Sequence, residues 1–401
     1  MDTTVTQIGE VVVAELHAAG YMNSTIGQYQ KTIKGLAEFV EERGGVYTPS
    51  LVAEFTSMTT SPRTGRFSAQ RRFDYGRLVA LFDSCMQRGR VDLSVRKRGG
   101  GGRQLATSEF ATLIAAWEAD MADRALALAT RSAYGRVARS YLVFLEDTGV
   151  VSLDRANAAS VFEFLESLLD RWAKSSLFWV VSNFRPFLTF IHRTDLVDAV
   201  NLTGIKRSHR ILPVLNDDDQ ELVVQKCMST MVSARDAALT LLTLTTGLRA
   251  CDIIALRLTD IDWRGQTIGI VQQKTNSPLT LPLAAVVTAK LAAYVLDERP
   301  DSNDDHVFLR SVAPHTQLVD HASIYTVIAK TFRKAGVTDI KGGTHFLRHN
   351  AASRLLRASV PLPTISAVLG HASPESTNLY MSVDENRLLE CVLPVPGGAQ
   401  S

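Results

Sequence analysis

The chain has 401 residues, of which 46% are hydrophobic and 21% charged, and its formal net charge at pH 7 is only +2. A chain of this length can bury large cores and is typical of two or three domains. The four cysteines are scattered without CxxC pairing, which argues against a disulfide framework or a zinc ribbon and favours a reducing compartment. The first residues show no signal-peptide pattern, and no apolar run is long enough to span a bilayer. We therefore expect a soluble, cytoplasmic protein without a membrane partner.

Two stretches in the first half of the chain resemble each other, because five positions recur 105 residues later. The pairs are Thr25 and Thr130, Tyr29 and Tyr134, Phe39 and Phe144, Glu41 and Glu146, and Gly44 and Gly149. The match covers a whole amphipathic helix, so we expect two copies of one small helical domain, at about 10–95 and 106–200. A chance match between amphipathic helices is the alternative.

Basic residues are concentrated in one segment, residues 61–103, which has eleven Arg or Lys side chains against three acidic ones, a local charge of +8. Its end, RKRGGGGR at 96–103, is too rich in glycine to fold and indicates a flexible linker that can follow a phosphate backbone. A charge run that only aids solubility is the alternative interpretation. A second basic junction, KRSHR at 206–210, indicates another domain boundary.

The region from about residue 212 begins with two expected helices. The first, ARDAALTLLTLTTG, is a buried helix that ends at Gly247, and the second, LRACDIIALRLTDIDW, begins with Arg249. The stretch QTIGIVQQKTNSPLTLPL then alternates like a β-hairpin, with Lys274 at the head of its turn. HVFLR predicts a short strand that follows the hairpin.

The last part of the chain predicts three further helices. One lies at about 321–335, and the next begins near GGT, with Thr344 as a candidate N-cap. PTISAVLGHASPESTNLYMSV predicts a helix closed by Gly370, His371 in a loop, and a new helix capped by Ser373 that carries Tyr380.

Two histidines, His345 and His349, lie four residues apart on one face of the expected helix. This is the spacing of zinc-chelating helices, but Phe346 occupies the position of the catalytic Glu, and no nearby Cys, Asp or Glu offers a third ligand. Arg348 lies on the same face, where its permanent charge would repel Zn²⁺ and would instead bind phosphate. Two buried histidines beside a surface arginine are the alternative. We expect an anion site and no metal.

A resemblance to the tyrosine recombinase (phage integrase) family rests on six residues that stand in the family's order: Arg249, Lys274, His345, Arg348, His371 and Tyr380. The resembling boxes are TGLRACDIIAL, HFLRHNAASRLL and ISAVLGHASPESTNLYMSV, within residues 212–390, and residues 106–200 match the family's core-binding domain more loosely. At three positions the residue differs from the one common in the family, and we expect these residues to lie behind the site or to face outward: Asp252, Phe346 and Asn350.

The resemblance implies attack on a DNA phosphodiester, which the chemistry of the side chains suits. Arg249 and Arg348 would clamp the non-bridging oxygens, and His371 would donate a further hydrogen bond. Tyr380 would be the nucleophile, and because the ordinary pKa of tyrosine is about 10 it needs a base, for which His345 is the candidate. Lys274 is the candidate acid that protonates the leaving 5′ oxygen.

Two further residues, Asp252 and His349, are expected to orient the arginines rather than to touch DNA. A 3′-phosphotyrosyl bond would store the energy of the phosphodiester, so the resemblance implies no cofactor, no metal and no ATP. The partner is double-stranded DNA, and the residues expected to bind it outside the catalytic set are Arg71, Arg72, Arg96, Lys97, Arg98, Arg103, Lys206 and Arg207.

The fold expected from these observations is mainly α, with a small antiparallel β-sheet in the catalytic domain and SAM-like helical DNA-binding domains before it. We expect an N-terminal DNA-binding domain with its basic linker at 1–103, a core-binding domain at 104–205, and a catalytic domain with a C-terminal tail at 206–401. The tail, DENRLLECVLP, is amphipathic and would pack on a neighbouring protomer or on its own catalytic domain.

The family implies a homotetramer on two DNA sites, with accessory DNA-bending or directionality proteins, in a bacterial cytoplasm and on the nucleoid when bound. The extra helical copy favours an integrase or transposase of a mobile element. The alternatives are a Xer-type recombinase that resolves chromosomes or plasmids, a type IB topoisomerase, a DNA-binding regulator without catalysis and, most distant, a zinc hydrolase.

Overall fold

The computed structural model describes residues 4–62, 64–94, 105–170, 172–206, 214–338 and 343–370. These residues form helices and one small antiparallel sheet, so the expected mainly α fold is confirmed. No helix in these described ranges is both long and apolar enough to cross a membrane. The chain divides into two compact units, residues 1–98 with 211–401, and residues 99–210. The expected middle domain, 104–205, lies within the second unit, and the expected boundaries of the other two domains, 1–103 and 206–401, stay a prediction.

The N-terminal region contains four helices around a core of its own. They are α1 (Val5–Ala18), α2 (Asn23–Glu41), α3 (Pro49–Ser57) and α4 (Ala69–Arg88). Local capping residues define the helix ends: the Thr48 hydroxyl accepts from the Leu51 N–H at the start of α3, and Gly89 closes α4 with a φ of 64°. The core is aliphatic and aromatic, and includes Leu16, Leu36 and Phe82.

The second unit is a separate helical bundle. Its elements are α5 (Ser108–Asp123), α6 (Leu128–Asp147), the 3₁₀ turn η1 (Leu153–Arg155), α7 (Ala158–Ser167), the 3₁₀ turn η2 (Lys174–Ser176), α8 (Leu177–Phe190) and α9 (Thr194–Leu202). Aromatic rings fill its centre, where Tyr141 meets Phe164 and Phe184 edge to face. The buried Tyr141 hydroxyl bonds the Ser160 hydroxyl at 2.8 Å, so burial leaves it paired.

The two helical regions have corresponding helices in the same order, which supports the internal repeat. The helices that carry the matched residues, α2 and α6, begin at Asn23 and Leu128, 105 positions apart. A long helix precedes each of them, and a short helix and then a longer one follow each of them.

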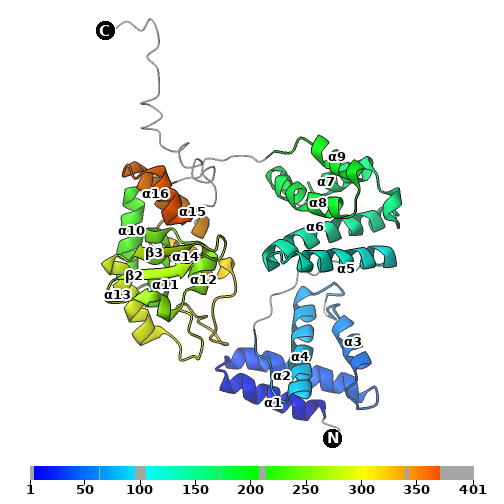
Figure 1. Ribbon diagram of the computed structural model, residues 1–401. Coiled ribbons are helices and arrows are strands. Elements are labelled where there is room, and N and C mark those ends of the chain that lie inside the picture. The colour runs from blue at the N-terminus through cyan, green and yellow to red at the C-terminus, as the bar shows by residue number, and fades with distance from the viewer. Residues whose placement is uncertain are drawn as a thin grey trace, which may run out of the picture. The chain divides into compact units, whose positions relative to one another are not determined.

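The C-terminal region is built around an almost entirely buried central helix, α11 (Ala234–Thr246), which packs against four other α-helices (Figure 1). These are α10 (Asp217–Met228), α13 (Ala285–Ala293), α14 (His321–Lys334) and α15 (Thr344–Arg357). Threonines are tolerated inside α11 because Thr240, Thr243 and Thr246 donate their hydroxyls to carbonyls one turn earlier. Gly247 ends α11 with a φ of 62°, as predicted.

The sheet of this region has three antiparallel strands in the order β1 (Ile261–Asp262), β2 (Thr267–Val271) and β3 (Pro278–Pro282). Ile268 pairs with Ile261 on one side and with Leu281 on the other, and all three side chains are buried. The predicted hairpin is therefore present, with Lys274 in the turn between β2 and β3. The remaining elements are α12 (Ala250–Ala255), the 3₁₀ turn η3 (Leu258–Asp260), the π-helical turn η4 (Tyr294–Glu298) and α16 (Leu362–Leu369).

Three local expectations are wrong. LRACDIIALRLTDIDW is not one helix, because α12 ends at Ala255 and the chain turns to pair with residues 305–307, where the Val307 N–H donates to Leu256 O at 2.8 Å. HVFLR forms no strand and makes only isolated bridges at His306 and Leu309. The N-cap of α15 is Gly343, one residue before Thr344. The expected cap at Ser373 lies outside the described residues.

Candidate active site

Arg249 is the N-cap residue of α12, directly after the left-handed turn that ends α11. Its guanidinium is half-buried and has two described partners: Nη1 donates to the side-chain Oε1 of Gln272 at 3.2 Å, and Nη2 donates to the backbone carbonyl of Gly370 at 2.8 Å. A permanent cation is therefore held beside the end of α16 by neutral oxygens.

Arg348 lies on α15 and is only 7% exposed. Its Nη1 donates to Gly247 O at 3.0 Å, and its Nη2 donates to Leu369 O. The turn that holds it is tight, because a Cβ on Gly247 would lie 3.0 Å from the Ala351 Cβ and 3.4 Å from the Arg348 Cα. The fold thus brings α11, α15 and α16 together at this guanidinium.

The two arginines, 99 positions apart in the sequence, converge on adjacent carbonyls at the C-terminal end of α16. Those carbonyls carry the negative end of the helix dipole, and they accept hydrogen bonds as phosphate oxygens do. The fork of donors on each guanidinium suits two oxygens of one phosphate group. This arrangement can therefore bind an anion at the place where the two side chains meet.

Lys274 is exposed in the turn between β2 and β3. Gln272 closes that turn, since its backbone N–H donates to Ser277 O at 2.9 Å and its carbonyl accepts from the Asn276 N–H at 2.8 Å. Asp252 supports the same turn from α12, because its Oδ1 accepts from the Gln273 N–H at 2.8 Å. We expected Asp252 to orient the arginines, and this hydrogen bond places its carboxylate against the lysine turn.

The two histidines of α15 occupy different environments: His345 is exposed, whereas His349 is 4% exposed. Burial, and then the neighbouring His345, lower the pKa of His349 below its ordinary value of 6.5, so His349 is neutral at pH 7. Of the two, His345 is the one whose side chain reaches solvent.

None of the three positions at which the residue differs from the one common in the family faces outward. Asp252, Phe346 and Asn350 are 2%, 6% and 0% exposed. Asn350 accepts the Leu215 N–H at 3.1 Å and donates to the Gln220 side chain at 3.3 Å, which ties α15 to the start of the region. Its role is therefore to hold α15 in place from behind.

The remaining predicted residues lie partly outside the described ranges. His371 and Tyr380 lie beyond the last described residue, Gly370, and Arg96, Lys97, Arg98, Arg103 and Arg207 are outside the described ranges as well. Among the described ones, Arg72 and Lys206 are exposed. Arg71 is half-buried and turns onto Tyr75, with its guanidinium carbon 4.9 Å from the centre of that ring. Arg71 is thus engaged inside its own helix.

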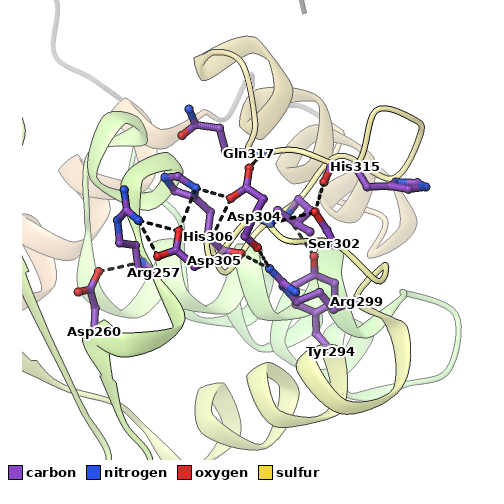
Figure 2. A network of polar contacts seen from close by, with 11 residues as sticks. Arg257, Asp260, Tyr294, Arg299, Ser302, Asp304, Asp305, His306, His315 and Gln317 are labelled. Atoms are coloured by element: carbon purple, nitrogen blue, oxygen red, sulfur yellow. Dashed lines mark hydrogen bonds and ion pairs between the residues drawn. The ribbon is translucent and has the colours of Figure 1, made fainter. Parts of the chain in front are cut away.

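A second polar group, shown in Figure 2, ties the loop at 299–317 to η3. Arg257 donates to both oxygens of Asp305 at 2.6 Å, His306 Nδ1 lies 2.5 Å from Asp304 Oδ1, and Asp304 Oδ2 accepts the Gln317 N–H at 2.8 Å. Among the described residues, Asp304, Asp305 and His306 are the three metal-ligating side chains that lie close enough together to share a cation. His345 and His349 do not belong to this group. Because Arg257 already neutralises Asp305, the group acts as a structural tie.

Sequence reasoning missed Gln272, which is fully buried between the lysine turn and Arg249. A signal was available in the hairpin. Alternation along β2 puts Ile268, Ile270 and Gln272 on one face, so a polar residue occupies an inward position. An amide at such a position needs buried partners.

Comparisons with known proteins relate the chain to one family. The sequence model of the phage integrase family matches residues 213–387. The chain is similar to y4rA of Sinorhizobium fredii, which is named an integrase/recombinase, with 31% identity over 72% of this chain and 71% of y4rA. It is also similar to tyrosine recombinase XerD of Oceanobacillus iheyensis, with 24% identity over 66% of this chain and 91% of XerD.

Among solved structures, the chain is similar to XerH site-specific recombinase bound to palindromic difH substrate, in a post-cleavage complex. The TM-score is 0.57 and the identity 16%, over 85% of this chain and 92% of that chain. At this identity the likeness concerns the fold.

Proposed function

The chain belongs to the phage integrase family, whose members are tyrosine recombinases that cut and rejoin DNA, and we propose that it is a site-specific recombinase acting through a 3′-phosphotyrosyl intermediate. The proposal includes the catalytic set Arg249, Lys274, His345, Arg348, His371 and Tyr380.

The single observation that carries this proposal is the convergence of Arg249 and Arg348 on the adjacent carbonyls of Leu369 and Gly370. A phosphodiester that is attacked gains charge on its non-bridging oxygens, and two preorganised guanidinia aimed at one place stabilise that charge. We infer that DNA phosphate takes up donors that neutral carbonyls occupy in the DNA-free chain.

The reaction then proceeds by side-chain chemistry. The hydroxyl oxygen of Tyr380 forms a bond to phosphorus and gives its proton to His345, while the bond from phosphorus to the 5′ oxygen breaks. Lys274 supplies the proton that the 5′ oxygen needs to leave as a hydroxyl. His371 donates a hydrogen bond to a non-bridging oxygen, and the neutral, buried His349 supports the helix that carries Arg348. The phosphotyrosyl bond keeps the energy for rejoining, so neither ATP nor a metal takes part.

The proposed biological role is integration, excision or transposition of a mobile element. The match to XerD takes up 91% of XerD but 66% of this chain, so this chain carries additional sequence outside that match. We assign residues 1–103 to an N-terminal helical DNA-binding domain that reaches a second stretch of DNA, 104–205 to a core-binding domain and 206–401 to the catalytic domain. A Xer-type role in chromosome or plasmid resolution is the second candidate, and the similarity to XerD favours it over a topoisomerase.

The proposed assembly is a homotetramer on two double-stranded DNA sites. The similarity in fold to XerH, which was crystallised on its difH substrate, supports DNA as the partner. Accessory DNA-bending or directionality proteins belong to the same proposal, and so does a cytoplasmic location on the bacterial nucleoid.

Covalent trapping on DNA tests the proposal. Nicked duplexes that tile the flanks of the protein's own gene are incubated with the protein, and adducts that resist denaturant are separated by gel electrophoresis. We expect an adduct on one flank sequence, and we expect Tyr380→Phe to abolish it. Tyr325→Phe is the matched control, because it removes the hydroxyl of an exposed tyrosine in the same region of the chain. An adduct that persists in Tyr380→Phe would refute the assignment.

A further inference from the structure

We propose that Gln272 is a positioning residue of this site: its buried side-chain amide holds the turn that carries Lys274 against Arg249 and the end of α16. The inference rests on the proposed function, because it concerns the groups to which that function assigns roles. No contact between Gln272 and DNA is involved.

The first support is the place of Gln272 in the turn. It follows β2 directly, it is fully buried, and its backbone N–H and carbonyl close the turn through Ser277 and Asn276 at 2.9 and 2.8 Å. Lys274 stands two residues later, inside the loop that these bonds define. A displacement of Gln272 would therefore move the lysine as well.

The second support is the set of partners of the amide. Its Oε1 accepts from Arg249 Nη1 at 3.2 Å and from the Thr275 hydroxyl at 2.8 Å, and its Nε2 donates to Leu369 O at 3.3 Å. A buried amide is costly unless it is hydrogen-bonded, so these bonds fix the side chain in one orientation. One side chain thus joins α12, the lysine turn and α16.

The third support is the close packing of the amide on Gly370. A Cβ at that position would lie 1.7 Å from Gln272 Oε1, so the amide occupies the space that any other side chain at residue 370 would need. The amide therefore packs closely against the end of α16 as well as bonding Arg249 and Thr275 of the lysine turn.

The chemistry of an amide suits this position better than that of a carboxylate. A glutamate at residue 272 would neutralise the charge of Arg249 and compete with phosphate for its donors. The amide oxygen accepts the same hydrogen bond and leaves the positive charge available to the substrate.

The consequence is a specific defect when the amide is removed. Arg249 would keep its bond to Gly370 O, whereas the turn would keep the Asp252 bond but lose the bond from the Thr275 hydroxyl to the amide, so the placement of Lys274 should suffer most. A lysine that donates the proton to the leaving group matters only if that group needs a proton. A thiol has a pKa of about 8.5, so a 5′ sulfur leaves as thiolate without one.

The experiment compares Gln272→Met with Gln273→Met, the same change one residue later, where the side chain is exposed. Both variants, the wild type and Lys274→Ala are prepared as full-length proteins. Each is added at a concentration that saturates the flank duplex on which the wild type forms the covalent adduct. One duplex is ordinary and the other carries sulfur in place of the bridging 5′ oxygen at the cleavage position. The rate of adduct formation is measured in a single turnover, and thermal unfolding is recorded for each protein.

We expect Gln272→Met to form the adduct roughly 10- to 100-fold more slowly than the wild type on the oxygen substrate, and within about threefold of it on the sulfur substrate. Gln273→Met should match the wild type on both. Equal slowing of Gln272→Met on both substrates, or no slowing, would overturn the inference. Lys274→Ala separates a failure of the proposed function from a failure of the inference about Gln272. If the sulfur substrate restores the rate of neither variant, the proposed role of Lys274 is wrong. If it restores the rate of Lys274→Ala alone, only the role of Gln272 is refuted.

Discussion

Replacing Gly370 with alanine should destabilise the catalytic region by about 4 kcal/mol. Gly370 has a φ of +61°, and a residue with a Cβ in this left-handed conformation costs roughly 1–2 kcal/mol. The added Cβ would lie 1.7 Å from Oε1, 2.4 Å from Cδ and 2.5 Å from Nε2 of Gln272, so the amide must leave its place. The three hydrogen bonds that it then loses contribute about 1 kcal/mol each.

Hydrogen exchange of peptides from α11 and α15 in a urea series measures this change, because it reports the catalytic region separately from the other helices. Gly89→Ala is the matched control, read on peptides from α4. Gly89 ends α4 with a φ of +64°, and an added Cβ would have no heavy atom within 4 Å, so Gly89→Ala should cost only the backbone contribution of roughly 1–2 kcal/mol.

A double-mutant comparison identifies the cause. In a Gln272→Ala background the amide is gone, and Gly370→Ala should cost no more than the backbone contribution, roughly 1–2 kcal/mol. An equal cost of Gly370→Ala in both backgrounds would refute the reasoning, because it would show that the alanine does not act through the amide.

The other predictions concern catalysis, DNA binding and pH. Lys274→Ala should slow cleavage and leave the affinity for DNA nearly unchanged in a gel-shift assay, whereas loss of binding would make the hairpin a DNA contact. Adduct formation should survive EDTA and need no nucleotide, because side chains supply the cationic clamp, and loss on chelation would revive a metal mechanism. Deleting residues 1–103 should leave cleavage of a minimal core site intact but impair recombination of full-length sites. The salt dependence of DNA binding should become less steep, because the +8 segment is removed. A truncated protein that is folded but forms no adduct at low salt would contradict the domain assignment. The hydrogen bond from Arg193 lowers the pKa of Asp195 below 3.8 in the folded protein. The Asp195 carboxylate should therefore stabilise the protein above that pH and lose this contribution as the pH falls through the folded pKa. Asp195→Asn should weaken the acid dependence of thermal unfolding, and an unchanged pH profile would contradict this role of Asp195.

The local elements that the sequence predicted correctly are those whose signals are local. Leucine and alanine recur around the whole helix at residues 237–244, which predicts burial, and Gly247 stops the helix because only glycine adopts its φ easily. The alternation of β2 and β3 and the polar turn between them gave the hairpin. Arg249 stands at a helix start for the same kind of reason, because the left-handed turn directly precedes it.

The features that the sequence did not predict depend on distant partners. The break after Ala255 and the absence of a strand at HVFLR share one cause, the backbone pairing of Leu256 with Val307, 51 residues away. The inward position of Asn350 depends on the Leu215 N–H, 135 residues away. Helical periodicity cannot reveal such partners, because it predicts the environment of a residue only from its neighbours along the chain.

The candidate site divides in the same way. The family's residue order indicated the two arginines and the lysine, and the structure adds the oxygens that the arginines contact. That Arg249 and Arg348 converge on the end of α16, with Gln272 between the lysine turn and Arg249, follows from the packing of segments that lie far apart in the sequence. No spacing of residues along the chain indicates it.

We propose that Tyr380 attacks a DNA phosphate held by Arg249 and Arg348. The most direct measurement is mass spectrometry of the nuclease-trimmed adduct, together with end-labelling of the released strand. We expect a phosphonucleotide on the peptide that contains Tyr380 and a released strand with a free 5′ hydroxyl. A nucleotide on any other residue, or a protein joined to the 5′ end of the broken strand, would contradict the claim.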